Sequence, residues 1–360
     1  MGCFHPLKRW IIAIHPYTGK QLAKVTSYDV EQVIVTDIKK GASTLDDFTL
    51  YMTRDNSPVP IVGQRLRPQE IPCGKCAGCR MDYARQWADR CMLELQYHDS
   101  AYFCTFTYDD QHLPLSGYVD DDTGEWLPSA TLFKRDFQLF MMRLRKKFGA
   151  GIRFFAAGEY GTTTFRPHYH AIIFGLKLDD LATWRRAIDS GIQDNFCYRT
   201  SPTLEKIWGQ GFVCVADVTW ETCAYTARYV MKKLKGPAAQ FYSDFNIAPP
   251  FTLMSRKPGI AAQYYLDHPD CMEYDSINIS TPTGGRKIRP PRYYQSLYEV
   301  DQPMAAAGLK LTRKKMAESV RKLKLEQTGL SYLEMLAVQE NALEERIKAL
   351  KRGYDENGKS

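Results

Sequence analysis

With 360 residues, the chain can bury a substantial core and is long enough for one large or two smaller domains. Its hydrophobic content of 44% and charged content of 25% are ordinary for a soluble globular protein, and no apolar run approaches the roughly 18 residues that a membrane span needs. The formal net charge of +7 is modest. Basic clusters at 134–147 and 310–324 fit a polyanionic partner, although solvated helix faces also carry such charges.

The N-terminal segment contains short strand-like pieces, such as 33–36, separated by polar turns. Its first residues lack the basic and apolar regions of a signal peptide, and Pro6 does not fit a myristoylation motif. The chain carries ten cysteines. Without a signal peptide, we expect reduced thiols in a cytosol rather than a disulfide framework.

Three cysteines, Cys73, Cys76 and Cys79, follow a C-x-x-C-x-x-C spacing that is short enough to wrap one ion. A structural zinc site needs four ligands, and the candidates for the fourth are Cys3, His5 and Cys91. We favour Cys3, because a short N-terminal arm can reach back, whereas Cys91 falls inside a predicted helix. The alternatives are cysteines without a metal and an iron–sulfur cluster, which usually takes more widely spaced thiolates.

Helices and strands alternate through the middle of the chain. The expected elements are a helix at 82–97, a strand at 101–108, a loop at 109–129, a helix to about 148, strands at 152–157 and 171–174, a helix at 179–190, a strand at 212–218 and a helix at 222–235. The two central strands lie close enough in sequence to form a hairpin. This order predicts an α+β fold, with a central antiparallel sheet covered by helices, rather than a doubly wound one.

The triplet His168-Tyr169-His170 stands directly before one of these strands. Residues two apart on a strand point to the same face, so both imidazoles project side by side. Glu159 ends the preceding strand, and the hairpin brings its carboxylate beside both histidines. Two nitrogens and one oxygen suit a divalent ion held with open positions for phosphate oxygens.

A second pattern lies on the helix at 222–235, where Tyr225 and Tyr229 are four residues apart and share one face. Lys232 or Lys233 follows one turn later. Tyrosine becomes a useful nucleophile when a metal polarises the phosphate it attacks and cations stabilise the developing charge. A His-x-His triplet on a strand, or two tyrosines on one helix face, is by itself more often a set of packing residues. The tyrosines together with the acid and the His-x-His triplet indicate a phosphoryl-transfer site.

These residues resemble the HUH endonucleases that start rolling-circle replication. The His168–His170 triplet is similar to the metal motif of that family, with Tyr169 at the normally hydrophobic middle position, and 103–107 is similar to its first motif. Further matches resemble the replication initiators of gokushovirus-type Microviridae: Cys3-Phe4-His5-Pro6, Pro72 to Arg80, Gln86-Trp87-Ala88, Gly158-Glu159-Tyr160-Gly161 and Arg166-Pro167-His168. The resemblance is specific from residue 3 to about 235 and weak in the C-terminal helix.

The resemblance implies a mechanism and four segments. Glu159, His168 and His170 would hold Mg²⁺ or Mn²⁺, and a tyrosine would form a 5′-phosphotyrosyl link on single-stranded or replicative-form DNA in the host bacterial cytoplasm. Host helicase and polymerase are the implied partners, and no membrane is involved. The segments are 1–100 with the cysteine knuckle, the HUH core at 101–240, a Pro/Tyr-rich extension at 241–306 with few clear elements, and a basic helical tail at 307–360 outside the compact core.

Three other functions fit parts of the sequence. A non-catalytic protein could bind single-stranded nucleic acid through exposed aromatics and basic helices, but it leaves the acid, histidines and tyrosines without a role. A transposase or relaxase of the HUH superfamily is the second alternative, and the tyrosine helix C-terminal to the histidines fits an initiator better. A zinc-dependent hydrolase is the third, although His-x-His on a strand lacks the helical spacing of common zinc proteases.

Overall fold

The computed structural model describes residues 2–15, 18–39, 42–54, 62–161, 164–186, 197–232, 236–281 and 284–349. The chain divides into two compact units. Unit 1 comprises residues 1–82 and 323–349, and unit 2 comprises 83–322. Within the described ranges, no helix is long and apolar enough to cross a membrane.

Unit 2 is built on a seven-stranded sheet in the order β12-β13-β14-β7-β11-β10-β15, in which all neighbouring strands are antiparallel. The strands are β7 (Ala101–Thr107), β10 (Arg153–Tyr160), β11 (Pro167–Phe174), β12 (Ala182–Arg186), β13 (Cys197–Thr200), β14 (Val213–Asp217) and β15 (Phe251–Met254). Strands β7 and β11 lie at its centre, and both of their faces carry buried apolar residues. The expected antiparallel sheet is confirmed.

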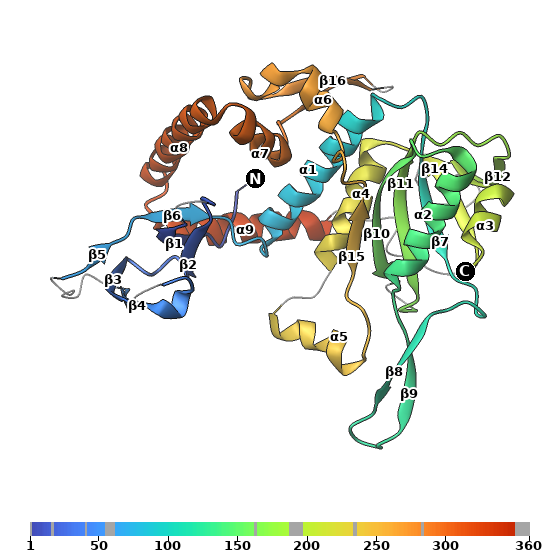
Figure 1. Ribbon diagram of the computed structural model, residues 1–360, viewed down its shortest axis with the longest axis horizontal. Coiled ribbons are helices and arrows are strands. Elements are labelled where there is room, and N and C mark those ends of the chain that lie inside the picture. The colour runs from blue at the N-terminus through green and yellow to red at the C-terminus, as the bar shows by residue number, and fades with distance from the viewer. Residues whose placement is uncertain are drawn as a thin grey trace. The chain divides into compact units, whose positions relative to one another are not determined.

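Helices cover both faces of this sheet (Figure 1). Helices α1 (Ala77–Leu95) and α4 (Trp220–Lys232) pack on one face, which includes Phe103, Phe155 and Ile172, and α6 (Ala262–Asp267) and α7 (Arg292–Asp301) contribute to the same hydrophobic core. Helices α2 (Lys134–Phe148) and α3 (Pro202–Trp208) pack on the other face, against Phe106 and Tyr169. Phe103 of β7 therefore contributes to the hydrophobic core on one face of the sheet, and Phe106 contributes to the core on the other. Two such cores are expected for a sheet between helical layers.

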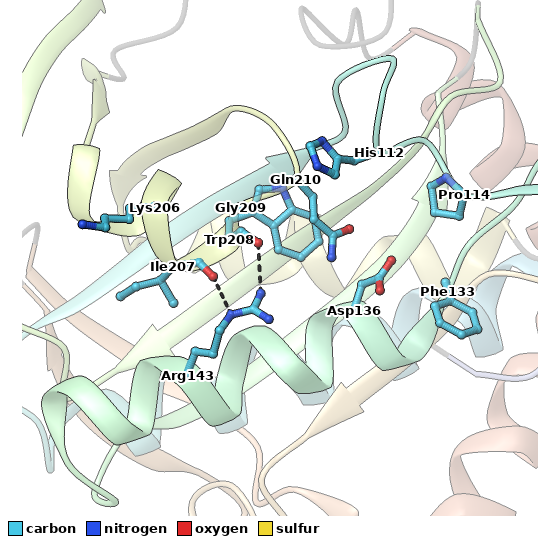
Figure 2. Close-up of a pocket in the computed structure, with 10 residues that line it drawn as sticks. All are labelled: His112, Pro114, Phe133, Asp136, Arg143, Lys206, Ile207, Trp208, Gly209 and Gln210. Atoms are coloured by element: carbon cyan, nitrogen blue, oxygen red, sulfur yellow. Dashed lines mark hydrogen bonds between the residues drawn. The ribbon is translucent and has the colours of Figure 1, made fainter.

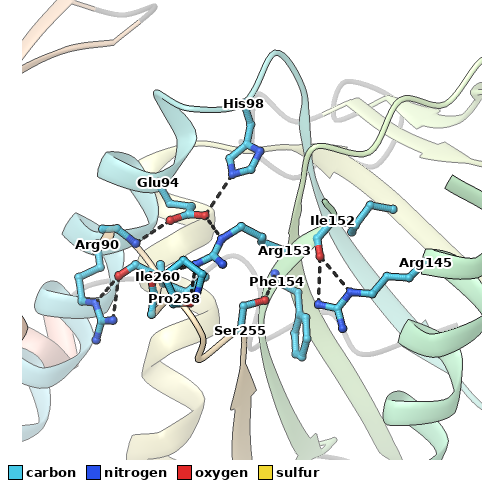
Figure 3. A network of polar contacts seen from close by, with 12 residues as sticks. Arg90, Glu94, His98, Arg145, Ile152, Arg153, Phe154, Ser255, Pro258 and Ile260 are labelled. Carbon is cyan, nitrogen blue, oxygen red and sulfur yellow. Dashed lines mark hydrogen bonds and ion pairs between the residues drawn. The ribbon is translucent and has the colours of Figure 1, made fainter. Parts of the chain in front are cut away.

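A buried carboxylate ties α1 to the sheet (Figure 3). Glu94 is 4% exposed, and its Oε1 accepts hydrogen bonds from His98 Nε2 at 3.1 Å and from Arg153 Nε on β10. Its Oε2 accepts the backbone N–H of Ala261 at 2.6 Å. Arg153 also donates to the carbonyls of Pro258 and Gly259, at 3.0 and 2.9 Å. Three distant parts of unit 2 thus meet at one ion pair.

Several expected elements differ from the structure. The predicted loop at 109–129 contains a hairpin, β8 (Leu115–Val119) and β9 (Trp126–Ala130), which projects from the sheet in Figure 1. Its acidic turn is ordered because Asp120 Oδ1 accepts the N–H groups of Asp122 and Thr123. The helix predicted at 179–190 is wrong at Ala182–Arg186, which pairs with β13 as strand β12. Residues 187–196 lie outside the described residues.

The region 241–306 is more regular than its composition indicates. Its strand β15 extends the central sheet beside β10. The remaining elements are α5 (Gln240–Asp244), the hairpin of β16 (Ile277–Thr281) and β17 (Gly284–Ile288), α6, α7, the start of α8 (Pro303–Glu326) and the 3₁₀ turn Pro269–Met272. Buried tyrosines, such as Tyr294 and Tyr265, join this region to the core on the α1 and α4 side.

The described residues of unit 1 form two small antiparallel sheets, the 3₁₀ turn Leu45–Asp47 and helix α9 (Tyr332–Ala349), together with the first residues of α1 and the last of α8. The first has the order β2-β1-β6, with β1 (Leu7–Ile14), β2 (Gln21–Thr26) and β6 (Pro68–Ile71), and the second has the order β4-β3-β5, with β3 (Gln32–Ile38), β4 (Phe48–Thr53) and β5 (Gln64–Arg65). Helix α9 buries Met335 and Leu336 against Phe4 and Cys76. Helix α9 is therefore part of this small core of unit 1.

Candidate metal centre and nucleophile

The hairpin of β10 and β11 brings Glu159, His168 and His170 together. Glu159 is paired directly with His168 across the two strands, and His170 lies two residues further along the same face. His168 Nε2 is 2.8 Å and His170 Nε2 is 3.2 Å from Glu159 Oε1. One ligand atom from each residue lies within 4.8 Å of the others. This arrangement can hold a divalent ion and leaves further coordination positions open.

The carboxylate of this cluster is buried, at 2% exposure, and so is His170, at 5%. Burial raises the pKa of Glu159, but the hydrogen bonds and positive charge of the two imidazoles outweigh it and lower the pKa to about 2. The acid therefore remains ionised at neutral pH. A fixed negative charge in a desolvated site is well suited to hold a cation.

Hydrogen bonds on the far side of each ring fix its orientation. His168 Nδ1 donates to the Arg166 carbonyl at 3.1 Å, and His170 Nδ1 lies 2.9 Å from the hydroxyl of Thr105 on β7. Phe103, two residues before Thr105, stacks on the His170 ring at 5.6 Å and 7°. Both Nε2 atoms consequently face Glu159, as metal-ligating histidines require. Our sequence analysis did not single out Thr105, although it lies in the motif strand 103–107.

Tyr225 lies against this cluster from helix α4. Its ring centroid is 5.3 Å from that of His170, at 77°, and 6.1 Å from that of Phe103. Cys223, Ala224 and Ala227 are buried, and their small side chains let α4 pack closely on the sheet face that carries the histidines. The guanidinium of Arg228 lies 6.0 Å from the Tyr225 ring. The structure therefore places one predicted tyrosine beside the predicted metal ligands.

The other residues of the tyrosine motif are only partly described. The backbones of Tyr229 and Lys232 belong to α4, but their side chains lie outside the described residues. Lys233 lies outside them entirely. A residue four positions after Tyr225 on a continuous helix lies one turn further along the same face.

The chain is similar to three replication-associated proteins of phages. It is 29% identical to the replication-associated protein ORF2 of Spiroplasma virus 4, over 88% of this chain and 95% of that protein. It is 30% identical to the replication-associated protein VP4 of Bdellovibrio phage phiMH2K, over 71% and 78%, and 29% identical to ORF4 of Chlamydia phage 1, over 45% and 38%. Residues 101–234 match the family of replication-associated proteins ORF2/G2P. The chain belongs to this family of phage replication-associated proteins.

The family match, 101–234, contains the whole Glu159, His168, His170 and Tyr225 cluster. The sequence-based assignment to the replication proteins of Microviridae is thus confirmed at the level of the family. No solved structure matches the chain.

The third tyrosine near the cluster, Tyr169, belongs to the opposite face of the sheet. Its side chain is fully buried, and its hydroxyl donates to the Phe133 carbonyl at 2.8 Å and lies 2.8 Å from that of Tyr108. Burial raises the pKa of both phenols, so neither ionises readily. These hydrogen bonds explain the presence of a hydroxyl at position 169. Tyr169 is a packing residue in this family member.

An open groove of about 540 Å³ lies on the α2 and α3 side of unit 2 (Figure 2). Asp136, Arg143 and Trp208 line it. Arg143 donates to the carbonyls of Ile207 and Trp208, so its guanidinium caps the end of α3. None of the residues of the Glu159 cluster lines this groove, and its Asp136 and Arg143 side chains are hydrogen-bonded to Tyr108 and to the end of α3.

The four predicted zinc ligands meet in unit 1. One sulfur from each of Cys3, Cys73, Cys76 and Cys79 lies within 4.8 Å of the others. The two rejected candidates lie elsewhere, because His5 pairs with Glu340 on α9 and Cys91 is buried in the core of unit 2.

Proposed function

We propose that this protein initiates rolling-circle replication of a phage as an HUH endonuclease, which nicks and rejoins DNA at the origin. The observation that carries the proposal is the position of Tyr225, whose ring lies 5.3 Å from that of His170 on the face that holds Glu159 and His168. Membership in a family of phage replication-associated proteins supports it. A nucleophile beside a set of metal ligands is the arrangement that a phosphoryl transfer needs.

Glu159, His168 and His170 are the residues that would hold Mg²⁺ or Mn²⁺. The bound ion would polarise the scissile phosphate and neutralise charge that develops on its oxygens. The carboxylate offers Oε1 and the imidazoles offer Nε2, and both Nε2 atoms lie within 3.2 Å of Oε1. Thr105 and the Arg166 carbonyl hold the rings in this orientation, so the ligands need little rearrangement.

In the proposed reaction, the phenol oxygen of Tyr225 or Tyr229 attacks the phosphorus and loses its proton. The bond between phosphorus and the 3′ oxygen breaks, and that oxygen takes up a proton to become a free 3′-hydroxyl for a host polymerase. The 5′ phosphate remains on the tyrosine. The phosphodiester energy is stored in this ester, so rejoining needs no ATP.

Two tyrosines permit two successive transfers. After a round of synthesis, the second phenol attacks the regenerated junction, and the two exchange roles as circles are released. Lys232 or Lys233 is the cation that we assign near the leaving oxygen. The DNA substrates are the single-stranded and replicative forms, in the host bacterial cytoplasm, and a host helicase is a further partner in this proposal.

The decisive experiment uses phage-length single-stranded DNA and Mn²⁺, followed by denaturing gels and mass spectrometry of the adduct. Wild-type protein should form a covalent adduct that maps to Tyr225 or Tyr229. The double variant Tyr225→Phe/Tyr229→Phe should form none, whereas the control Tyr274→Phe, at an exposed position of unit 2, should form normal amounts. Continued nicking by the double variant contradicts the assignment of the nucleophile.

The same assay, extended to transposon-end and plasmid-origin DNA and to the variant His168→Ala, separates the alternatives. DNA binding without any cleavage by the wild-type protein favours a passive binder of single strands. Cleavage at transposon ends or a plasmid transfer origin, rather than in phage DNA, favours a transposase or relaxase of the same superfamily. Loss of cleavage in His168→Ala, with binding unchanged, assigns the metal ligands to catalysis rather than to DNA affinity.

A further inference from the structure

Four cysteine sulfurs in unit 1 surround a single point. Cys73 Sγ is 4.0 Å from Cys79 Sγ, and Cys76 Sγ is 4.0 Å from Cys3 Sγ. These separations are about twice the length of a disulfide bond, so the sulfurs are not paired with one another. A tetrahedral ion with metal–sulfur bonds of about 2.3 Å requires sulfurs about 3.8 Å apart. The observed spacing fits four ligands of one ion.

Backbone amides are directed at these sulfurs. Cys76 Sγ accepts the N–H of Phe4 at 3.3 Å and that of Cys79 at 3.5 Å. Cys73 Sγ accepts those of Lys75 and Cys76, both at 3.3 Å, and Cys3 Sγ accepts that of Cys73 at 3.2 Å. A neutral thiol is a weak acceptor, whereas a thiolate accepts strongly. Five amides directed at three of the four sulfurs are therefore arranged for thiolates, the form that binds metal.

Two glycines allow the cysteines to converge. Gly74 has a φ of +69°, a conformation that a residue with a side chain adopts only with strain. Gly78 lies under the N-terminal arm, where an added Cβ would be 2.3 Å from the Gly2 carbonyl oxygen and 2.8 Å from the Phe4 ring. Without a side chain at 78, the arm can lie across the turn and bring Cys3 to the other three cysteines.

The cysteines lie at the centre of a small core. Phe4 and Cys76 pack with Met335 and Leu336 of α9, and partly buried Leu325, Tyr332 and Leu343 surround them. The second cluster of unit 1 is also small, with buried Trp10, Val30 and Val33. Cores of this size supply little stability on their own, and small modules commonly rely on a structural metal.

We propose that Cys3, Cys73, Cys76 and Cys79 bind one structural Zn²⁺, which ties the N-terminal arm and helix α9 into unit 1. Zinc is the ion of choice because four thiolates in a closed tetrahedral shell are a typical structural zinc site. An iron–sulfur cubane places each thiolate on a different iron and needs a wider cage than sulfurs within 4.8 Å provide. The cysteine site is separate from the proposed Mg²⁺ or Mn²⁺ site, and the structural role of the zinc does not depend on the ion at Glu159, His168 and His170.

The first test is metal analysis and X-ray absorption of the full-length protein. We expect one zinc per chain with four sulfur neighbours at about 2.3 Å. Zinc bound instead at Glu159, His168 and His170 would show nitrogen and oxygen neighbours. A folded preparation with less than a fifth of an equivalent of zinc, or with iron in its place, overturns the proposal. Cobalt exchange should give the visible absorption of tetrahedral Co²⁺ bound by thiolates.

The second test compares two cysteine variants by hydrogen exchange and zinc content. Cys76→Ser should lose the zinc, and the backbone amides of Phe4, Cys73 and α9 should lose at least tenfold of their protection, while the sheet of unit 2 keeps its own. Cys197→Ser, a matched change on β13 of unit 2, should keep both zinc and protection.

Gly78→Val, which leaves all four thiols in place, should also lower zinc affinity by displacing the N-terminal arm. Full zinc retention in Cys76→Ser and Gly78→Val contradicts the assignment.

Discussion

At the scale of single residues, one threonine hydroxyl orients His170, one of the two histidines of the proposed metal site. Thr105 Oγ1 lies 2.9 Å from His170 Nδ1, on the side of the ring that faces away from Glu159. A partner on the far nitrogen fixes the ring and raises its basicity as a ligand. Thr105 is thus a positioning residue.

Thr105→Val removes this hydroxyl at almost constant volume, and we expect Mn²⁺ affinity to fall about 10- to 100-fold. Calorimetric titration of Mn²⁺ measures it. Thr105→Ser keeps the hydroxyl and should restore affinity. Thr107→Val is the matched control two residues along β7, because the Thr107 hydroxyl bonds the Phe212 carbonyl rather than a histidine. Equal affinity in Thr105→Val and wild type would remove the positioning role.

Tyr169 offers a contrasting residue on the same triplet. Tyr169→Phe leaves the Phe133 carbonyl without its 2.8 Å donor and should destabilise unit 2 by about 1–3 kcal/mol. It should not change Mn²⁺ affinity or adduct formation, because Tyr169 faces away from Glu159. Urea denaturation together with the gel assay checks both expectations. Loss of the adduct in a folded Tyr169→Phe protein would show that this face also serves catalysis.

At this scale, strand alternation was the most informative feature of the sequence. It places His168 and His170 on one face and Tyr169 on the other, and the register of β10 and β11 brings Glu159 opposite His168. The hydrogen bonds of Thr105 and Tyr169 depend on β7 and α2, which are distant in sequence. No local pattern reports such partners.

At the scale of the elements, buried helices and strands were predictable from their apolar periodicity, and exposed ones were not. Helix α2 buries Phe137, Phe140 and Leu144 at helical spacing, and its end at Phe148 matches the expected one. The hairpin of β8 and β9 exposes Leu115, Val119 and Trp126, and it lacks the alternation that half-buried strands show. Strand β12 is likewise exposed at the sheet edge, where tertiary pairing outweighs local preference.

The ion pair of Glu94 and Arg153 is the connection between elements that is most sensitive to substitution. Both side chains are largely buried, at 5% and 17% exposure, so removing one partner leaves a buried charge. We expect Glu94→Ala to destabilise unit 2 by about 3–5 kcal/mol in urea denaturation. Glu299→Ala, on the exposed side of α7, should change stability by less than about 0.5 kcal/mol. A similar small change for Glu94→Ala would exclude a structural role for the pair.

The contribution of the Glu94–Arg153 pair to the stability of unit 2 depends on pH in a defined direction. Burial raises the pKa of Glu94, and hydrogen bonds from His98, Ala261 and Arg153 outweigh it, so its pKa is lowered in the folded state. Its contribution to stability is therefore complete above the unfolded value of about 4.3 and is lost as the pH falls through the folded value. Glu94→Ala should consequently flatten the acid limb of the stability curve.

At the scale of the whole molecule, unit 1 combines the two ends of the chain. Residues 323–349 belong with residues 1–82, and Leu336 packs near Phe4 although more than 300 positions separate them. The cysteine spacing predicted a metal site, and the proximity of an N-terminal arm favoured Cys3. The contribution of α9 could not be predicted, because its apolar positions fit a partner helix as well as a place in this core.

The two units are stabilised by different groups, so substitutions in each should affect different thermal transitions. Cys76→Ser removes a proposed zinc ligand of unit 1, whereas Glu94→Ala breaks an ion pair of unit 2. In scanning calorimetry we expect two transitions, since compact units with separate cores need not unfold together. Glu94→Ala should lower the unit 2 transition by on the order of 10 °C and leave the other in place.

Cys76→Ser should abolish the unit 1 transition and leave that of unit 2 in place, while Cys197→Ser changes neither. Hydrogen exchange on α9 and on β11 assigns each transition to its unit. Changes at sites with no shared partner are additive, so the double variant should show both effects without a further shift. A single transition that both variants lower by the same amount would instead mean that unit 1 and unit 2 unfold as one cooperative body.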